Sequence, residues 1–242
     1  MMPKGSIVNA VAVIAGTMLG ILIKGKLSEK FKTTIMQALG LAVIIIGLSG
    51  TLSAIFKVAS NGTLENNNIM TMIIFLVLGS IIGEAIDIEE KLNRFANFAQ
   101  KKLPGSEGNF SVGFVTATLL FCVGAMAIVG SLEEGLTGNA DTLYAKSILD
   151  GTSSIIFSAT LGIGVLFSSV PVLLYQGSIT LLAGILKPLL TPDVINQMSL
   201  VGNILILGIG LNILKIRTIK VGNMLPAVFL PIIYYLIRIL IG

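Results

Sequence analysis

The chain has 242 residues, of which 54% are hydrophobic and only 12% are charged, and its formal net charge is +4. An ordinary soluble domain carries about 25% charged residues, so this composition excludes the soluble globular class. The chain holds no histidine and one cysteine, Cys122, which excludes histidine-based catalysis, histidine-ligated metals and a disulfide within the chain. We therefore expect neither a metal site nor a cofactor.

Apolar stretches follow one another along almost the whole chain. A bilayer core about 30 Å thick needs about 20 apolar residues per helical crossing, which predicts an all-α integral membrane protein with one polytopic domain over residues 1–242. The first stretch lacks a small-residue cleavage site, which favours a retained helix over a signal peptide. We expect the break after the fifth stretch to lie at Ser168–Pro171, because the residue before a proline is pushed out of helical geometry. The eight predicted crossings are 5–23, 34–56, 69–86, 110–131, 143–168, 171–187, 198–214 and 224–241.

Basic residues predict the orientation. Eleven of the sixteen lie in three loops, 24–33, 87–109 and 215–223, whereas loop 132–142 is acidic and has none. Eight crossings place the three basic loops on one side, and the positive-inside rule makes that side cytoplasmic with both termini outside. Seven crossings would put one basic loop on the opposite side. Because the basic residues flank apolar stretches, the net charge predicts no nucleic-acid partner.

Segment 87–103 is too charged to cross a membrane, and its apolar residues recur at helical spacing. It predicts an amphipathic helix lying on the cytoplasmic interface. The Gly16/Gly20 and Gly79/Gly83 pairs each precede a basic stretch, and a third basic loop follows Gly208–Gly210. This pattern predicts parallel helix-hairpin repeats, although glycine-rich helices with basic ends also arise without duplication. Glycine-lined faces allow close helix contact and favour a homo-oligomer.

The fifth crossing carries a charged pair, Lys146 and Asp150, which are four residues apart and therefore share a helix face. Ionisable groups at membrane depth are expensive and usually face a cavity or a partner, so the pair predicts a polar lining for a pathway. Under this hypothesis Asp150 binds a cation or proton, Lys146 is its counter-charge, and Ser154 on or beside the same face contributes a polar group. The alternative is that the helix begins later and the pair lies in the outer headgroup region.

Other polar residues also have two interpretations. Glu133 and Glu134 either attract cations to an outer mouth of the pathway or form a solvated helix end. Tyr175 and Gln176 either contact a substrate or join helices by hydrogen bonds. No phosphate loop, Gly-x-Ser-x-Gly elbow or His-Glu-x-x-His motif occurs, and one credible aspartate lies at membrane depth, so we expect no enzyme.

Several blocks of the chain resemble the YqgA/YdfK family of bacterial inner-membrane proteins, a domain of unknown function. They include GEAIDIEEKLNRF at 83–95, FCVGAMAIVGSLEEGL at 121–136, KSILDG at 146–151 and NMLPAVF at 223–229. The resemblance covers essentially the whole chain. It implies a multi-pass protein of the bacterial cytoplasmic membrane, and it implies no activity and no functional residues.

Two functions therefore remain open. The first is a small secondary transporter or channel-like permease for a small ion or metabolite, with its pathway through the fourth to sixth crossings. The second is a non-transporting assembly or regulatory protein of the lipid bilayer, which acts through the amphipathic helix 87–103.

Overall fold

The computed structural model describes residues 2–24, 28–58, 64–66, 68–91, 94, 98, 110–122 and 124–241. Its contacts divide the chain into two compact units. Unit 1 comprises Met1–Met36 and Glu90–Lys187, and unit 2 comprises Gln37–Glu89 and Pro188–Gly242. The chain thus passes between the units three times, so neither unit is a continuous segment. The single polytopic domain expected from the sequence stays a prediction.

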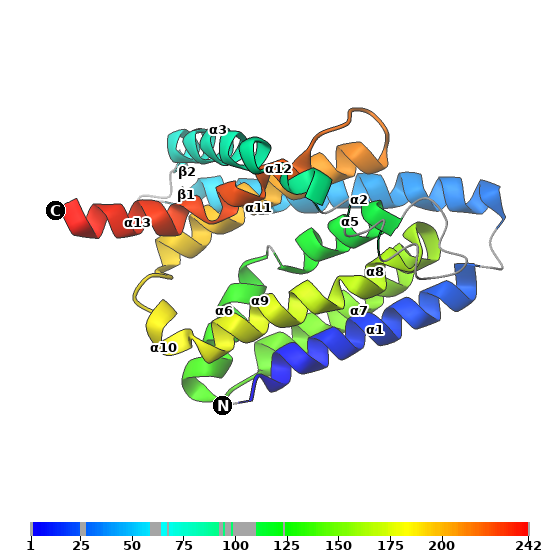
Figure 1. Cartoon of the computed structure of the whole chain (residues 1–242), viewed down its shortest axis with the longest axis horizontal. Coiled ribbons are helices and arrows are strands. Elements are labelled where there is room, and N and C mark those ends of the chain that lie inside the picture. The colour runs from blue at the N-terminus through cyan, green and yellow to red at the C-terminus, as the bar shows by residue number, and fades with distance from the viewer. Residues whose placement is uncertain are drawn as a thin grey trace. The chain divides into compact units, whose positions relative to one another are not determined.

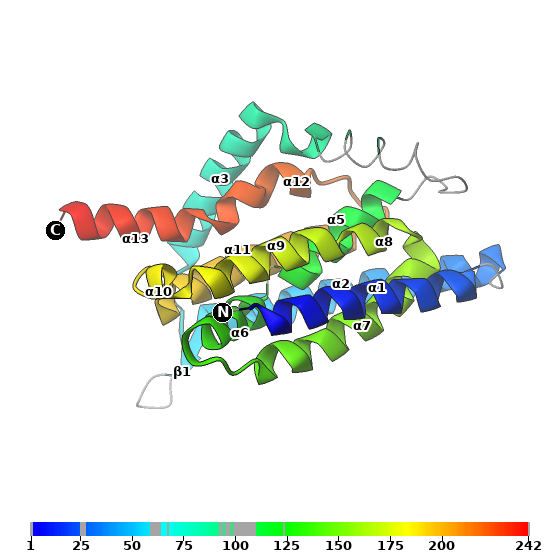
Figure 2. The same cartoon turned by 60° about the horizontal axis from the view of Figure 1, so that its bottom comes forward.

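Unit 1 is built around the long contact between α1 and α7, which run beside each other in both Figure 1 and Figure 2. The two helices are parallel, because Gly5 meets Leu143 near one end and Gly20 meets Ser158 near the other. Helix α9 packs against both α1 and α6 and runs antiparallel to α1. The elements are α1 (Lys4–Lys24), α5 (Phe110–Cys122), α6 (Ala125–Thr137), α7 (Asp141–Leu161), α8 (Gly164–Phe167), α9 (Ser169–Leu181) and α10 (Ala183–Leu186).

Unit 2 has α11 at its centre, since α11 is the most buried of its long apolar helices. Helix α2 packs antiparallel to α11, with Gly40 near Ile213 and Gly50 near Asn203. A short antiparallel hairpin, with Phe56 opposite Asn66, joins α2 to α3. The elements are α2 (Glu29–Ile55, whose first turns belong to unit 1), β1 (Phe56–Val58), β2 (Leu64–Asn66), α3 (Ile69–Ile86), α11 (Pro192–Ile213), α12 (Val221–Met224), η1 (Leu225–Val228) and α13 (Leu230–Ile241).

The all-α fold class is confirmed, but four of the expected crossings are interrupted. The crossing 171–187 is divided between α9 and α10 at Leu182, and 224–241 contains the 3-10 turn η1 before α13 begins. Residues 110–131 are not one helix: α5 and α6 meet at a 56° bend, where Gly124 adopts an extended conformation. The break after the fifth crossing lies at Gly162 and not at Ser168–Pro171. Gly162 has a φ of +83°, a backbone conformation that glycine adopts more easily than any other residue. Pro171 instead lies in the first turn of α9, where its missing N–H costs no helical hydrogen bond.

Among the described residues, six helices are long and apolar enough to cross a membrane, and the bent α5–α6 pair makes a seventh. Helix α7 is outside this set because it is more polar, although its 21 residues span about 31 Å. If the chain crosses a membrane eight times, successive crossings alternate in direction, and the helix directions within each unit agree with this alternation. The count of eight crossings stays a prediction. The structure describes only part of the expected interfacial helix 87–103. Asp87 lies in a turn and residues 88–91, 94 and 98 are helical, whereas the other residues of this segment lie outside the described part of the chain.

Glycines allow the backbones of α1 and α7 to touch. A Cβ atom added to Gly16 would lie 2.1 Å from the carbonyl oxygen of Gly151, and one added to Gly20 would lie 2.3 Å from that of Ile155. Such distances are impossible for real side chains, so any larger residue forces the helices apart. Small residues are what membrane helices use to gain close packing.

In unit 2, a polar cluster joins the end of α3 to the start of α12. Asn223 donates to Glu84 at 2.6 Å, and the backbone N–H of Gly222 donates to the Glu89 carboxylate at 2.9 Å. The Glu89 N–H in turn donates to Asn223 Oδ1 at 2.7 Å, and Lys220 pairs with Glu84. Burial raises the pKa of the Glu89 carboxyl above its ordinary value of 4.5, while the Gly222 N–H and Lys220 oppose this shift.

We expect Gly16→Ala to lower the stability of the folded protein by about 1–3 kcal/mol, because overpacking separates α1 from α7. Gly184→Ala is the matched control, since nothing lies within 4 Å of a Cβ atom built there. Thermal unfolding in detergent, followed by far-ultraviolet circular dichroism, measures both variants. Equal melting temperatures for the two variants would contradict the close contact.

The Glu89 shift predicts a specific pH dependence. A carboxyl whose pKa is raised by folding favours the native state while it is protonated, and this contribution is lost as the pH rises through the folded pKa. We therefore expect the melting temperature of Glu89→Gln, relative to that of the parent protein, to rise between pH 4 and pH 7. The control is Glu90→Gln, whose exposed side chain pairs with Arg94. The same trend in both variants would argue against a local effect of Glu89.

Candidate functional site

The charged pair of α7 is buried. Lys146 Nζ lies 3.0 Å from Asp150 Oδ1 and 2.9 Å from Oδ2, and each residue is 5% exposed. The helix brings them together because residues four apart lie on one face. Helix α7 begins at Asp141 and ends at Leu161, so Asp150 lies close to its midpoint. The structure thus places both charges inside a helix that starts before them.

Two amide side chains from other helices complete this site. Asn9 of α1 donates through Nδ2 to Asp150 Oδ2 at 2.9 Å and to Gln176 Oε1 of α9 at 3.1 Å. Asn9 and Gln176 are fully buried. The Asp150 carboxylate therefore receives an ammonium from its own helix and an amide N–H from α1, and Asn9 links this pair to α9.

The amides retain unused hydrogen-bonding capacity. Asn9 Oδ1 and Gln176 Nε2 are buried and have no hydrogen-bond partner among the described residues. Buried polar atoms are nearly always paired, so each exception needs an explanation such as a water, an ion or a ligand. A free amide oxygen beside a carboxylate is the kind of oxygen pair that hard cations prefer. The site can therefore accept a small cation or a proton donor if Lys146 withdraws.

The structure does not bring Glu133 and Glu134 together at one mouth. Glu134 is 2% exposed, and its carboxylate accepts the backbone N–H of Gly5 at 2.8 Å. It thereby binds the first turn of α1, where the helix dipole favours a negative charge. Glu133 instead accepts from Thr142 Oγ1 at 2.7 Å and from Asn139 Nδ2 at 3.0 Å, so it fastens the turn between α6 and α7.

Ser154 and Tyr175 lie near the site without completing it. The Ser154 hydroxyl donates to the Asp150 carbonyl oxygen of its own helix at 2.7 Å. Tyr175 is half-buried and makes no hydrogen bond to any described residue. Of the five predicted pathway residues, the structure joins Lys146, Asp150 and Gln176. Asn9 was absent from that set, and its only signal in the sequence is a polar residue within an apolar stretch.

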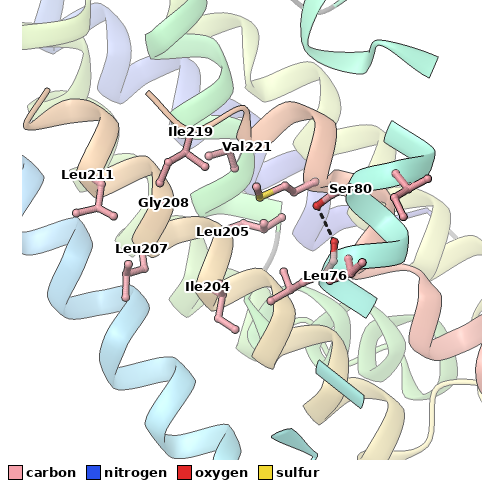
Figure 3. A pocket seen from close by; sticks show the side chains of 12 residues that line it. Leu76, Ser80, Ile204, Leu205, Leu207, Gly208, Leu211, Ile219 and Val221 are labelled. Carbon is pink, nitrogen blue, oxygen red and sulfur yellow. Dashed lines mark hydrogen bonds between the residues drawn. The ribbon is translucent and has the colours of Figure 1, made fainter. Parts of the chain in front are cut away.

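Unit 2 contains an apolar groove of about 490 Å³ between α3 and α11. Figure 3 shows the side chains of Leu76, Leu205 and Val221 in its wall, and the hydroxyl of Ser80 directed at the Leu76 carbonyl oxygen, 2.6 Å away. Because that hydroxyl is already paired, the groove offers apolar contact and little else. Nor do the described residues contain a group of three or more His, Cys, Asp and Glu side chains that could hold a metal ion.

Comparison with known proteins places the chain in a family. Residues 4–236 match the family described as "Protein of unknown function (DUF554)". The chain is 32% identical over 227 residues to the uncharacterized membrane protein YdfK of Bacillus subtilis (strain 168), which covers 94% of this chain and 93% of YdfK. It is 34% identical over 232 residues to the uncharacterized protein YqgA of Escherichia coli (strain K12), which covers 93% of each chain. No solved structure matches. The chain is therefore an α-helical membrane protein that belongs to the DUF554 family, in agreement with the predicted resemblance to YqgA and YdfK.

Proposed function

We propose that this protein is a small secondary transporter or channel-like permease of the bacterial cytoplasmic membrane, with both termini outside. The observation that carries the proposal is the Lys146–Asp150 pair, buried near the midpoint of α7 beside an unpartnered amide oxygen. In this function Asp150 binds the coupling cation or proton. Lys146 competes with that cation for the same carboxylate.

The energetics of buried charges support a functional role over a structural one. Removing two charges from water costs several kcal/mol per ion, and apolar residues of similar volume often stabilise a protein as well or better. Ionisable residues inside membrane proteins accordingly mark ion pathways and proton relays more often than they act as fasteners. A pair such as Lys146–Asp150 is therefore difficult to explain by stability alone.

The geometry supports an exchange of one cation for another on the Asp150 carboxylate. In the state described, the Lys146 ammonium neutralises Asp150, so no net charge has to be moved through the membrane when the site is empty. A proton or a small cation on the Asp150 carboxylate displaces Lys146 and lets the unpaired Asn9 Oδ1 act as a second oxygen ligand. The site then carries one net positive charge until the Lys146 ammonium reaches water or gives up its proton. Asn9 Nδ2 holds the carboxylate in place throughout. Coupling follows because the carboxylate binds either Lys146 or the cation.

We expect Asp150→Asn to abolish coupled flux while the protein remains folded, because a neutral amide neither binds a proton near neutral pH nor attracts a cation. The measurement is charge movement in proteoliposomes on a solid-supported membrane, with protons, alkali cations and small metabolites as candidate substrates and an internal pH dye to detect electroneutral exchange. Asp141→Asn, on the exposed first turn of the same helix, is the matched control.

Flux retained in Asp150→Asn would exclude this role for the carboxylate. Silence of the parent protein in every assay, with folding and insertion verified, would favour the assembly or regulatory function through segment 87–103. That function predicts loss of a partner when Phe95 and Phe98 are made polar. Phe98 is exposed, and Phe95 lies outside the described residues.

Stability and function should separate in variants of the pair. Lys146→Met leaves Asp150 buried without its counter-charge, and loss of one partner of a buried pair costs about 3–5 kcal/mol. The double variant Lys146→Met/Asp150→Leu removes both charges, so we expect its melting temperature to return close to that of the parent while flux stays absent. Lys187→Met, at an exposed position, is the control. A double variant as unstable as the single one would indicate that the pair is chiefly structural.

A further inference from the structure

Besides its apolar groove, unit 2 contains a polar pocket of about 300 Å³. It lies where α3 and α11 begin and α13 approaches its end, and it is independent of the ion pair of unit 1. Its wall includes Asn68, Asp193, Gln197, Tyr234 and Arg238. A pocket of this size is at the small end of the range for ligand sites, so it suits a compact molecule.

The pocket presents two opposite charges that do not neutralise each other. Asp193 and Arg238 both line it, and the ion pairs found among the described residues do not join them. Asp193 Oδ2 accepts from Gln197 Nε2 at 2.8 Å, which holds the carboxylate at the wall and leaves Oδ1 without a described partner. A guanidinium and a carboxylate are thus both available to a molecule in the pocket.

The wall of the same pocket contains two amides with unused atoms. Gln197 is only 7% exposed, and its Nε2 also approaches Asn68 Oδ1 at 3.5 Å, the outer limit of a hydrogen bond. Gln197 Oε1 and Asn68 Nδ2 are buried and have no partner among the described residues. The pocket therefore offers one unpaired buried acceptor and one unpaired buried donor in addition to its charges. Such atoms call for a bound group that satisfies them.

We propose that this pocket binds a small zwitterion, with its anionic group on Arg238 and its ammonium group on Asp193 and Gln197 Oε1. Arginine binds phosphate and carboxylate oxygens through parallel N–H donors, and ammonium groups donate to carboxylate and amide oxygens. The ring of Tyr234, packed edge-on against Phe75 with centroids 5.9 Å apart, forms a rigid wall. The zwitterion is either a soluble molecule or the headgroup of a zwitterionic lipid, since tyrosines are typical of the membrane interface.

Calorimetric titration of the full chain in detergent with O-phosphoethanolamine, phosphate and ethanolamine tests the proposal. We expect phosphoethanolamine to bind at least tenfold more tightly than either half. Arg238→Gln should weaken the binding of phosphoethanolamine and of phosphate at least tenfold and leave ethanolamine binding unchanged. Asp193→Asn should instead weaken ethanolamine binding and leave phosphate binding unchanged. Arg217→Gln, at an exposed position in the loop between α11 and α12, is the control for the loss of a positive charge.

Quantification of co-purified phosphatidylethanolamine by mass spectrometry distinguishes the two sources. Lipid present in equimolar amount and lost in Arg238→Gln, with phosphoethanolamine binding only after delipidation, identifies a lipid headgroup. Binding without delipidation identifies a soluble zwitterion. The proposal is overturned if neither result is obtained with folded protein, if phosphate alone binds as tightly as phosphoethanolamine, or if Arg217→Gln weakens binding as much as Arg238→Gln.

Discussion

The contact between α1 and α7 is the constraint on which the polar interior of unit 1 depends. In a bilayer no hydrophobic force drives one apolar helix against another, so van der Waals contact and hydrogen bonds must hold them together. Gly5, Gly16 and Gly20 let α1 approach until it meets side-chain and backbone atoms of α7. Only at that separation does Asn9 reach Asp150 at 2.9 Å. The same approach seats the first turn of α1 on Glu134, so the glycine positions of α1 determine where the charged groups meet.

Much of this arrangement follows from the sequence, because it depends on local periodicity. The expected crossing 69–86 has the bounds of α3 (Ile69–Ile86), and the expected crossing 5–23 differs from α1 by one residue at each end. The four-residue spacing of Lys146 and Asp150 predicts their contact on any helix. Small residues at helical spacing also indicate close packing, although they do not say which helix is the partner.

The rest could not be predicted because it depends on long-range contacts. Gly162 and Pro171 both signal a helix break, and the observed break lies at the glycine because Pro171 falls where a first helical turn tolerates it. Glu133 and Glu134 are adjacent and chemically identical, yet only Glu134 faces the start of α1, which is more than a hundred residues away in the chain. Asn9 becomes part of the site for the same reason, since its partners belong to α7 and α9.

The two units reach related polar chemistry by different routes. In unit 1 Asn9 donates both to Asp150 and to Gln176, and in unit 2 Gln197 donates to Asp193 and approaches Asn68. Each set leaves one amide oxygen and one amide nitrogen unpaired. The predicted helix-hairpin repeats stay a prediction, and the glycine pairs on which they rest pack differently. Gly16 and Gly20 pack on a parallel helix, whereas Gly79 and Gly83 pack on the antiparallel segment of Asn223 and Ala227.

The two sites differ in how their cationic side chain is placed. Lys146 already occupies the buried carboxylate of unit 1, so a ligand there must displace a charge, and the transport that we propose depends on that exchange. Arg238 shares a pocket wall with Asp193 and forms no described ion pair with it, so a ligand there can engage both charges without displacing either. The burial of Lys146 and its pairing with Asp150 therefore suit the site of unit 1 to cation exchange, whereas Arg238, which has no ion pair among the described residues, suits the pocket of unit 2 to simple binding.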